Sequence, residues 1–301
     1  MAEEFKILFV VNPASGTSSK NNWEATIREF FKPFQHKIEF FLLTGKNDAE
    51  SLAYWIEQIT PDRVVAVGGD GTVSLVAEQL LGKDMAIGIL PAGSANGMAK
   101  ELDISTNMKD ALHTILEGEV RHSDVIRINK NQICLHLSDL GLNAQLVKYF
   151  EKGNLRGKLG YAKLIFKVLL NKKLMHVNIV ADGKEIMRKA FMVVIANASK
   201  YGTGALINPT GNIHDGKFEI VIVRKIAFGE VLKMFLHFKR FNPKKVEVFH
   251  ATTAQINTRN NTDFQVDGEY LGKVKSVEAE IIAGKLKVLL PKDHANNNKK
   301  P

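Results

Sequence analysis

The sequence contains few of the residues and runs that cross-link or anchor a chain. Its 301 residues include one cysteine, Cys134, and a single thiol excludes both a disulfide framework and a CxxC zinc site. No uninterrupted apolar run approaches the roughly 20 residues of a membrane-spanning helix. The beginning, MAEEFKILFVVNP, lacks the basic start and cleavage site of a signal peptide. We therefore expect a cytoplasmic protein whose contact with a membrane is peripheral.

Two common phosphate-binding motifs are also missing. No Gly-Lys pair is followed by Ser or Thr, and no GxGxxG occurs, which excludes a Walker-type loop and a Rossmann dinucleotide loop. Lys and Arg outnumber Asp and Glu by 41 to 32, and the net charge of +9 favours anionic partners. Aromatic residues are not interleaved with the basic runs, and no RNA- or DNA-binding module is recognisable. We expect no nucleic acid among the partners.

The first part of the chain alternates between strand-like and helix-like patterns. Strands are predicted at 5–11, 37–43, 63–67 and 85–90, and helices at 22–32, 47–58, 72–81 and 108–117. Uniformly apolar strands separated by helices indicate a parallel sheet that is covered on both faces. We therefore predict a doubly wound, mostly parallel α/β domain over residues 1–122.

The second part, residues 123–285, is dominated by strands and hairpins. Turn signals at DGK (182–184) and AGK (283–285) separate apolar segments of strand length, and only 143–171 and 228–240 look helical. This pattern favours a mostly antiparallel β-sandwich domain. The last strand, from about 286 to 301, is a candidate to pack back on the first domain.

Glycine-rich or polar loops follow all four predicted strands of the first domain. They are NPASG (12–16), LLTGK (42–46), GGDGT (68–72) and LPAGSAN (90–96). In open α/β sheets ligands bind beyond the carboxyl ends of the strands. Glycine lets backbone N–H groups approach an anion closely, and a helix N-terminus adds a positive dipole. Any one loop could be an ordinary strand-to-helix turn, but four at one edge predict a site for a phosphate chain.

Several spaced motifs resemble one known family. GGDGT, followed closely by GILPAGSANGMA, is similar to the catalytic domain of the diacylglycerol kinase and sphingosine kinase superfamily. HSDVIRIN, GTGALINPTGNIHDGKFEIVIV and QVDGE at 265–269 resemble the later signatures of that family, in order. The resemblance covers nearly the whole chain. It implies an ATP- and Mg²⁺-dependent kinase whose second domain binds a lipid and which phosphorylates a hydroxyl of diacylglycerol or a related acylated alcohol.

The resemblance and the needs of phosphoryl transfer together name the candidate residues. The reaction requires countercharge on the phosphates and a group that takes the hydroxyl proton. Asp70 and Glu269 are the candidate catalytic carboxylates, and which of them takes the proton is left open. Asp124 and Asp215 are candidate Mg²⁺ ligands, each with a turn-closing role as the alternative. The candidate nucleotide residues come from the four loops: Asn12, Ser15, Gly16, Thr44, Gly68, Gly69, Gly71, Thr72, Gly93, Ser94 and Asn96.

Two positions depart from the family pattern, and two other functions compete. Bacterial diacylglycerol kinases carry Asn-Asp-Phe-Ala where this chain has NGMA, so Gly97 replaces an aspartate and the metal network must differ. Gln145 stands where sphingosine kinases place an aspartate for the amino head group, which removes the charge that would bind a sphingoid cation. GGDGT also occurs in nicotinamide-dinucleotide kinases. Such a kinase is one alternative, and a catalytically silent lipid- or nucleotide-binding protein is the other.

Two stretches that mix apolar and basic residues are candidates for lipid contact. They are LRGKLGYAKLIFKVLLNKK (155–173) and FGEVLKMFLHFKRFNPKK (228–245). An acyl chain requires an apolar wall, and basic side chains can rest on anionic headgroups. We expect a lipid substrate and peripheral contact with an anionic membrane surface, with ordinary core packing of these helices as the alternative. A homodimer is left open.

Overall fold

The computed structural model describes residues 4–15, 23–152, 168, 173–200, 206–225, 242 and 244–292. The chain divides into two compact units. Unit 1 combines residues 1–123 with residues 284–301, and unit 2 comprises residues 124–283. Strand β5 (Glu119–Ile128) therefore leads out of unit 1, and strand β14 (Glu269–Leu290) leads back into it.

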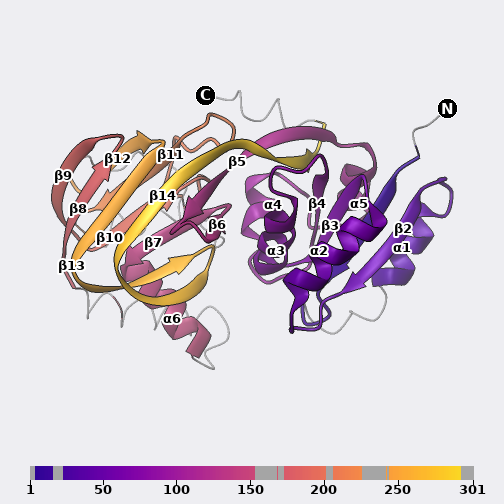
Figure 1. Ribbon diagram of the computed structural model, residues 1–301, viewed down its shortest axis with the longest axis horizontal. Coiled ribbons are helices and arrows are strands. Elements are labelled where there is room, and N and C mark those ends of the chain that lie inside the picture. Colours follow the sequence, from indigo (N-terminus) through magenta and orange to yellow (C-terminus); the bar gives the residue numbers. More distant parts are fainter. Residues whose placement is uncertain are drawn as a thin grey trace. The chain divides into compact units, whose positions relative to one another are not determined.

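Unit 1 is built on a parallel sheet (Figure 1). All pairings among its first four strands are parallel, in the order β2 (Lys37–Leu42), β1 (Lys6–Val11), β3 (Arg63–Gly68) and β4 (Ala86–Pro91). Near its end, β14 adds a further parallel pairing to β4, through Lys287 and Val288. Every residue of β3 is buried. This continuous burial explains the unbroken apolar run, and it confirms the predicted parallel sheet.

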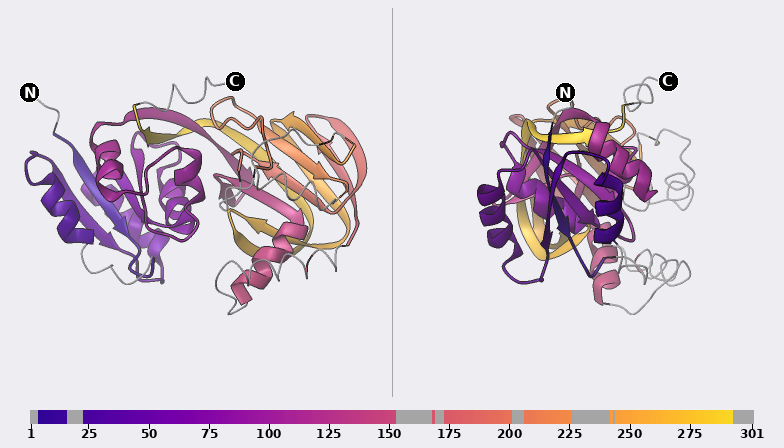
Figure 2. Two further views of the ribbon diagram at one scale, coloured as in Figure 1. Left: turned by 180° about the vertical axis from the view of Figure 1, so that it is seen from behind. Right: turned by 90° about the vertical axis from the view of Figure 1, so that its right-hand side faces the viewer.

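Helices cover both faces of this sheet (Figure 2). On one face α3 (Asp70–Leu80) packs against the central strands, and α2 (Asp48–Ile59) and α4 (Gly97–Glu101) contact α3. On the other, α5 (Met108–Glu117) packs on β4 and contacts α1 (Trp23–Phe31). The doubly wound α/β class predicted from the apolar pattern is thus confirmed. Each fully buried aliphatic side chain in this core contributes about 1.5–3 kcal/mol through burial.

Unit 2 is a mostly antiparallel β-sandwich, which also confirms the prediction. One layer runs in the order β12 (Val246–Ala251), β11 (Phe218–Val223), β10 (Met192–Ala196), β7 (Leu137–Gly141) and β13 (Thr253–Val266). The other contains the rest: β9 (Lys184–Ala190), β8 (Met175–Ala181), and the parts of β14, β5 and β6 (Gln132–Cys134) in this unit.

Strand β13 belongs to both layers of unit 2. Its last residues, Phe264–Val266, pair with β7, whereas Ala254–Thr258 pairs with β8. Shifts in its register with β14 lie between these halves, and such irregularities bend a strand. The apolar side chains of both layers meet in one core that includes Phe218, Ile220 and Ile256. The bent strand β13 thus connects the two layers, and the core lies between them.

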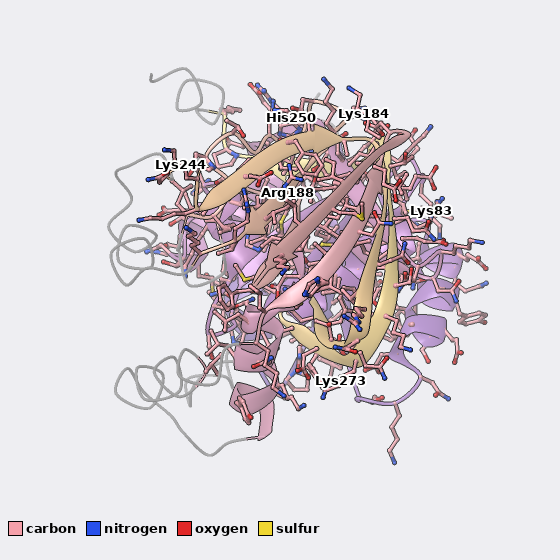
Figure 3. The ribbon with its side chains drawn as sticks, turned by 90° about the vertical axis from the view of Figure 1, so that its left-hand side faces the viewer. Lys83, Lys184, Arg188, Lys244, His250 and Lys273 are labelled. Carbon is pink, nitrogen blue, oxygen red and sulfur yellow. The ribbon has the colours of Figure 1, made fainter. Side chains whose placement is uncertain are left out.

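A charged network joins edge strands β9 and β12. Arg188 on β9, labelled in Figure 3, donates from Nε to both carboxylate oxygens of Glu247 on β12, each at 3.0 Å. Arg224, just after β11, donates to the same carboxylate at 2.7 Å. Charged side chains on edge strands also discourage pairing with other chains. The network therefore links the two layers and protects their open edges.

Three details of the chain differ from the sequence-based expectations. The AGK triplet does not form a hairpin turn, because β14 continues through it and only bends at Gly284, where φ is +59°. Helix α4 was not expected, since five residues are too few to show a helical period. Helix α6 (Leu142–Lys152) occupies the first part of the predicted 143–171 helix. Most of the remainder, and the whole predicted 228–240 helix, lie outside the described residues.

Replacing Arg63 should destabilise unit 1 because its buried guanidinium satisfies the end of α5. It donates to the carbonyl oxygens of Ile115 and Leu116 and lies 3.6 Å from the centre of the Phe5 ring. Arg63→Leu leaves those carbonyls without this donor, and we expect a loss of about 2 kcal/mol, measured by urea unfolding. Arg121→Leu, which breaks an exposed ion pair with Glu119, is the control and should cost less than about 1 kcal/mol. Equal losses would contradict this role for Arg63.

Candidate functional site

The four loops of unit 1 are neighbours at the carboxyl edge of its sheet. Because the strand order is β2-β1-β3-β4, the loop with Thr44 lies next to that with Asn12, followed by GGDGT and PAGSAN. Backbone hydrogen bonds join successive strand ends: Leu43 N to Val11 O (2.9 Å), Asn12 N to Val67 O (3.0 Å) and Ala92 N to Gly68 O (2.8 Å). The structure therefore brings together the described residues of all four loops.

A side-chain contact ties the NPASG loop to GGDGT. Asn12 donates from Nδ2 to Oγ1 of Thr72 at 3.3 Å, and its Oδ1 accepts the N–H of Ala14 at 2.9 Å. A Cβ atom at Gly68 would lie 2.2 Å from Oγ1 and 2.6 Å from Cβ of Thr72, and no rotation of the Thr72 side chain moves its Cβ, so only glycine fits there. The N–H of Ser15 bonds to the carbonyl of Asn12. Gly16 lies outside the described residues.

The GGDGT and PAGSAN loops touch through their main chains. A Cβ atom on Gly93 would lie 2.4 Å from Cα of Gly69, which no side chain could relieve by rotating. Asn96 braces its own loop, because its side chain accepts the N–H of Gly93 and donates to the Gly93 carbonyl, both at 2.9 Å. Ser94 is exposed between them. Glycine at position 93 is therefore a requirement of packing, whereas a Cβ atom on Gly69 would make a tight contact of 3.2 Å with Cα of Gly93.

Asp70 spans from one of these loops to the other. It is the first residue of α3, and its two carboxylate oxygens accept the N–H groups of Gly97 (2.9 Å) and Met98 (3.0 Å) at the start of α4. Gly69, the N-cap of α3, has no side chain that could cap the helix. Gly71 faces open space, since a Cβ there would meet nothing within 4 Å. Packing within unit 1 therefore does not explain why residue 71 is glycine.

Sequence reasoning selected Thr44 but missed Asp48, which shapes its turn. The carboxylate of Asp48 accepts the N–H and hydroxyl of Thr44 at 2.9 Å and the N–H of Gly45 at 2.8 Å. These bonds, that from the Thr44 N–H foremost, hold the pKa of Asp48 below its usual value. The signal was available, because an Asp side chain can bind backbone N–H groups three or four residues earlier in the chain, and Asp48 follows the Thr44-Gly45 turn at that distance.

The two candidate metal ligands of unit 2 meet at one turn. Asp124 is buried, and its Oδ2 accepts the N–H of Gly216 at 2.7 Å. Asp215 is exposed and accepts the N–H of Lys217 at 3.1 Å. Within the described part of the chain, no three His, Cys, Asp or Glu side chains gather closely enough to hold a metal ion. These are the contacts of turn-holding residues, and a metal role stays a prediction for both.

The QVDGE motif of unit 2 is organised around Asp267, which sequence reasoning did not select. Its carboxylate accepts a hydrogen bond from the thiol of Cys134. It also accepts the backbone N–H groups of Leu135, His136 and Leu137, and the four distances are 2.7–3.3 Å. Burial raises the pKa of Asp267. Gln265 accepts the N–H of Gly268 at 2.7 Å. Glu269, at the end of the motif, is exposed.

A second buried carboxylate lies beside this motif. Gln265 donates from Nε2 to Asp139 at 2.5 Å, and Asn143 of α6 donates to the same oxygen at 2.6 Å. Asp139 and Gln265 are almost fully buried. Gln145, two residues further along α6, is half-buried. Side chains of β7 and α6 thus hold the motif in place within unit 2 through hydrogen bonds. Glu269 is the acid of the motif that is exposed.

Two domain families match the chain. The diacylglycerol kinase catalytic domain matches residues 6–128, and the YegS C-terminal NAD kinase beta sandwich-like domain matches residues 138–290, about half of the chain. The chain belongs to the diacylglycerol kinase family. Its relatives are kinases, which supports a nucleotide-binding kinase here.

One relative matches this chain over nearly its whole length, and two solved structures share its fold. The diacylglycerol kinase of Bacillus subtilis (strain 168) is 24% identical over 295 residues, which are 95% of this chain and 96% of that protein. A diacylglycerol kinase structure from Bacillus anthracis str. Sterne has a TM-score of 0.76 at 19% identity, covering 97% of this chain and 99% of its own. An Archaeoglobus fulgidus NAD kinase in complex with ATP has a TM-score of 0.57 at 15% identity, covering 97% and 96%.

Replacing Asp267 should weaken unit 2, because one carboxylate satisfies the N–H groups of Leu135, His136 and Leu137. Asp267→Ala leaves them without that acceptor, and we expect a loss of about 3 kcal/mol. Urea unfolding followed by circular dichroism measures it. Asp215→Ala, which removes one bond at an exposed site, is the matched control and should change stability by less than about 1 kcal/mol. A loss no larger than that of the control would show that the carboxylate is dispensable.

Proposed function

We propose that this protein transfers the γ-phosphoryl group of ATP to a hydroxyl of a lipid, diacylglycerol or a related acylated alcohol. The observation that carries the proposal is the edge of unit 1, where four loops are hydrogen-bonded side by side and two of them touch through glycine backbone. Such an edge presents backbone N–H groups to a phosphate chain without intervening side chains. Membership of the diacylglycerol kinase family supports the lipid acceptor.

The nucleotide would be held by small residues of these loops. Gly71 is open to solvent at the first turn of α3, where a side chain would obstruct a phosphate. Thr44 and Ser94 are exposed and offer hydroxyl groups. Asn12 is partly buried and Thr72 is buried, and the two side chains are hydrogen-bonded to each other. They would therefore support the loops rather than contact the nucleotide directly.

The chemistry of the donors in unit 2 is compatible with Mg²⁺. This ion prefers oxygen ligands, and usually takes one or two carboxylates together with phosphate oxygens and water. Asp215 has an exposed carboxylate with one bond to a backbone N–H, and Asp124 holds the same turn. We name these two residues as the candidates to hold it. When bound, Mg²⁺ would supply positive charge against the phosphate oxygens.

Glu269 is our candidate for the group that takes the proton of the acceptor hydroxyl. It is exposed, whereas the acids that brace its motif, Asp267 and Asp139, already accept several hydrogen bonds. A carboxylate on a rigid turn can accept a proton as the hydroxyl oxygen attacks phosphorus. This braced position supports a catalytic role for Glu269.

Contact with a membrane would be peripheral. Among the described helices, none combines the length and the apolar character that a bilayer crossing requires. Of the basic residues in the two stretches predicted to meet lipid, Lys173, Lys244 and Lys245 are described, and they are partly or fully exposed. We propose that such residues rest on anionic headgroups, each contributing about 1 kcal/mol.

A panel of acceptors tests the reaction. Purified protein is incubated with γ-labelled ATP and Mg²⁺, together with diacylglycerol, other acylated alcohols, a sphingoid base or NAD⁺. We expect label in the organic phase with diacylglycerol or a related alcohol. Label confined to the aqueous phase with NAD⁺ would favour a dinucleotide kinase, the alternative that the Archaeoglobus fulgidus neighbour suggests. No label with any acceptor would favour a silent binding protein.

Replacing Glu269 tests the proposed proton acceptor. Glu269→Gln keeps the size of the side chain but cannot take the proton, so kcat should fall by roughly 10² or more. Glu278→Gln, an exposed glutamate further along β14, is the matched control and should retain activity. A change confined to KM would indicate positioning rather than proton transfer.

A further inference from the structure

The contacts of Asp70 bear on two possible roles of this residue, that of a proton acceptor and that of a positioning residue. A proton acceptor directs a carboxylate oxygen at the acceptor hydroxyl, whereas a positioning residue directs it at other parts of the protein. In Asp70, Oδ2 accepts the N–H of Gly97 at 2.9 Å and Oδ1 accepts that of Met98 at 3.0 Å. Both oxygens therefore face the backbone of α4. Hydrogen bonds of this kind, with a charged acceptor, are stronger than neutral ones.

These two bonds form one half of a clamp between the GGDGT and PAGSAN loops. The other half is the main-chain contact between Gly69 and Gly93, where the added Cβ of Gly93 would come within 2.4 Å. Asn96, at φ +50°, closes the PAGSAN loop onto Gly93 between the two halves. The loop is thus held at Gly93 by backbone contact, and the start of α4 directly after the loop is held by Asp70.

The clamp determines where the backbone N–H groups of both loops point. If the bonds to Gly97 and Met98 are lost, α4 and the preceding loop are free to move away from the first turn of α3. A phosphate chain bound by amides from both loops would lose part of its contacts, since binding depends on their simultaneous approach. Loss of the carboxylate would then weaken nucleotide binding rather than remove a proton acceptor.

We propose that Asp70 is a positioning residue, which acts on phosphoryl transfer by clamping the PAGSAN loop and α4 to GGDGT. The proposal rests on the proposed function, and it assigns the proton of the acceptor to another group. It also gives a physical reason for an aspartate in a loop of small residues. The two carboxylate oxygens of Asp70 accept one backbone N–H group each, from Gly97 and from Met98, whereas a serine or a threonine offers a single oxygen.

Asp70→Asn tests the proposal. The amide retains one acceptor oxygen and turns an NH₂ group toward the other N–H, so one of the two bonds is lost. We expect calorimetry with ATP and Mg²⁺ to show affinity reduced about tenfold or more, with KM for ATP raised to match. The turnover that remains at saturating ATP should keep the wild-type dependence of kcat on pH, because the proton acceptor is intact.

Two further variants complete the test. Asp182→Asn is the matched control, because Asp182 likewise accepts two backbone N–H groups, those of Thr252 and Thr253, but in unit 2. It should leave ATP affinity unchanged. Gly93→Ala opens the clamp from its other half while the carboxylate stays in place. It should reproduce the loss of ATP affinity, and it decides the question if Asp70→Asn fails to fold.

Two results would overturn the proposal. In one, Asp70→Asn binds ATP as the wild type does, while kcat falls to background. The decrease in kcat at low pH is then also lost, and Asp70 would be identified as the proton acceptor. In the other, neither Asp70→Asn nor Gly93→Ala changes ATP affinity. Failure of the proposed function is distinguishable from both, because the wild type would then phosphorylate no lipid, whereas calorimetry still reports the clamp without an acceptor.

Discussion

The main chains at Gly69 and Gly93 lie in contact at the carboxyl edge of a parallel sheet, and the whole candidate site of unit 1 is arranged around that approach. It depends on the absence of a side chain at Gly93, where a Cβ atom would lie 2.4 Å from Cα of Gly69. The neighbouring polar residues maintain it: Asp70 binds the first N–H groups of α4, and Asn96 folds its loop back on Gly93. Backbone amides from two loops are thereby held near one place. Clustered backbone N–H groups of this kind form concavities that can bind anions.

Carboxylates that hold backbone N–H groups recur in both units. Asp48 binds the turn after β2, and Asp124 binds the turn at Gly216. Asp267 binds three successive amides that lead into β7, Leu135 to Leu137. Each of these acids stabilises a bend that no regular strand or helix pairing would satisfy. Their dispersal agrees with the finding that the described residues contain no metal-holding cluster of three. Glu269 and Asp215 differ from these acids in being exposed.

Some features of the fold were predictable and some were not, for reasons that specific residues illustrate. The buried run RVVAVG could be assigned to a central parallel strand, because only a strand covered on both faces is apolar throughout. The prediction of a hairpin turn at AGK was wrong, because a glycine at positive φ can occur in a turn or in a bend of a continuous strand. Strand pairing distinguishes the two cases here: the first part of β14 pairs with β13, and its last part pairs with β4. Helix α4 escaped notice because five residues carry no period.

The sequence by itself determined the alternation of strands and helices, the antiparallel second half and the placement of small-residue loops after each early strand. These features depend on the local pattern of apolar and polar residues, because the spacing of apolar residues indicates whether a segment is buried on one face or on two. Tertiary structure alone decided the strand order that makes the four loops neighbours, and the pairing of Asp70 with an amide 27 residues along the chain. A hydrogen bond between distant segments forms only after packing brings them together, and no local pattern specifies which segments will meet.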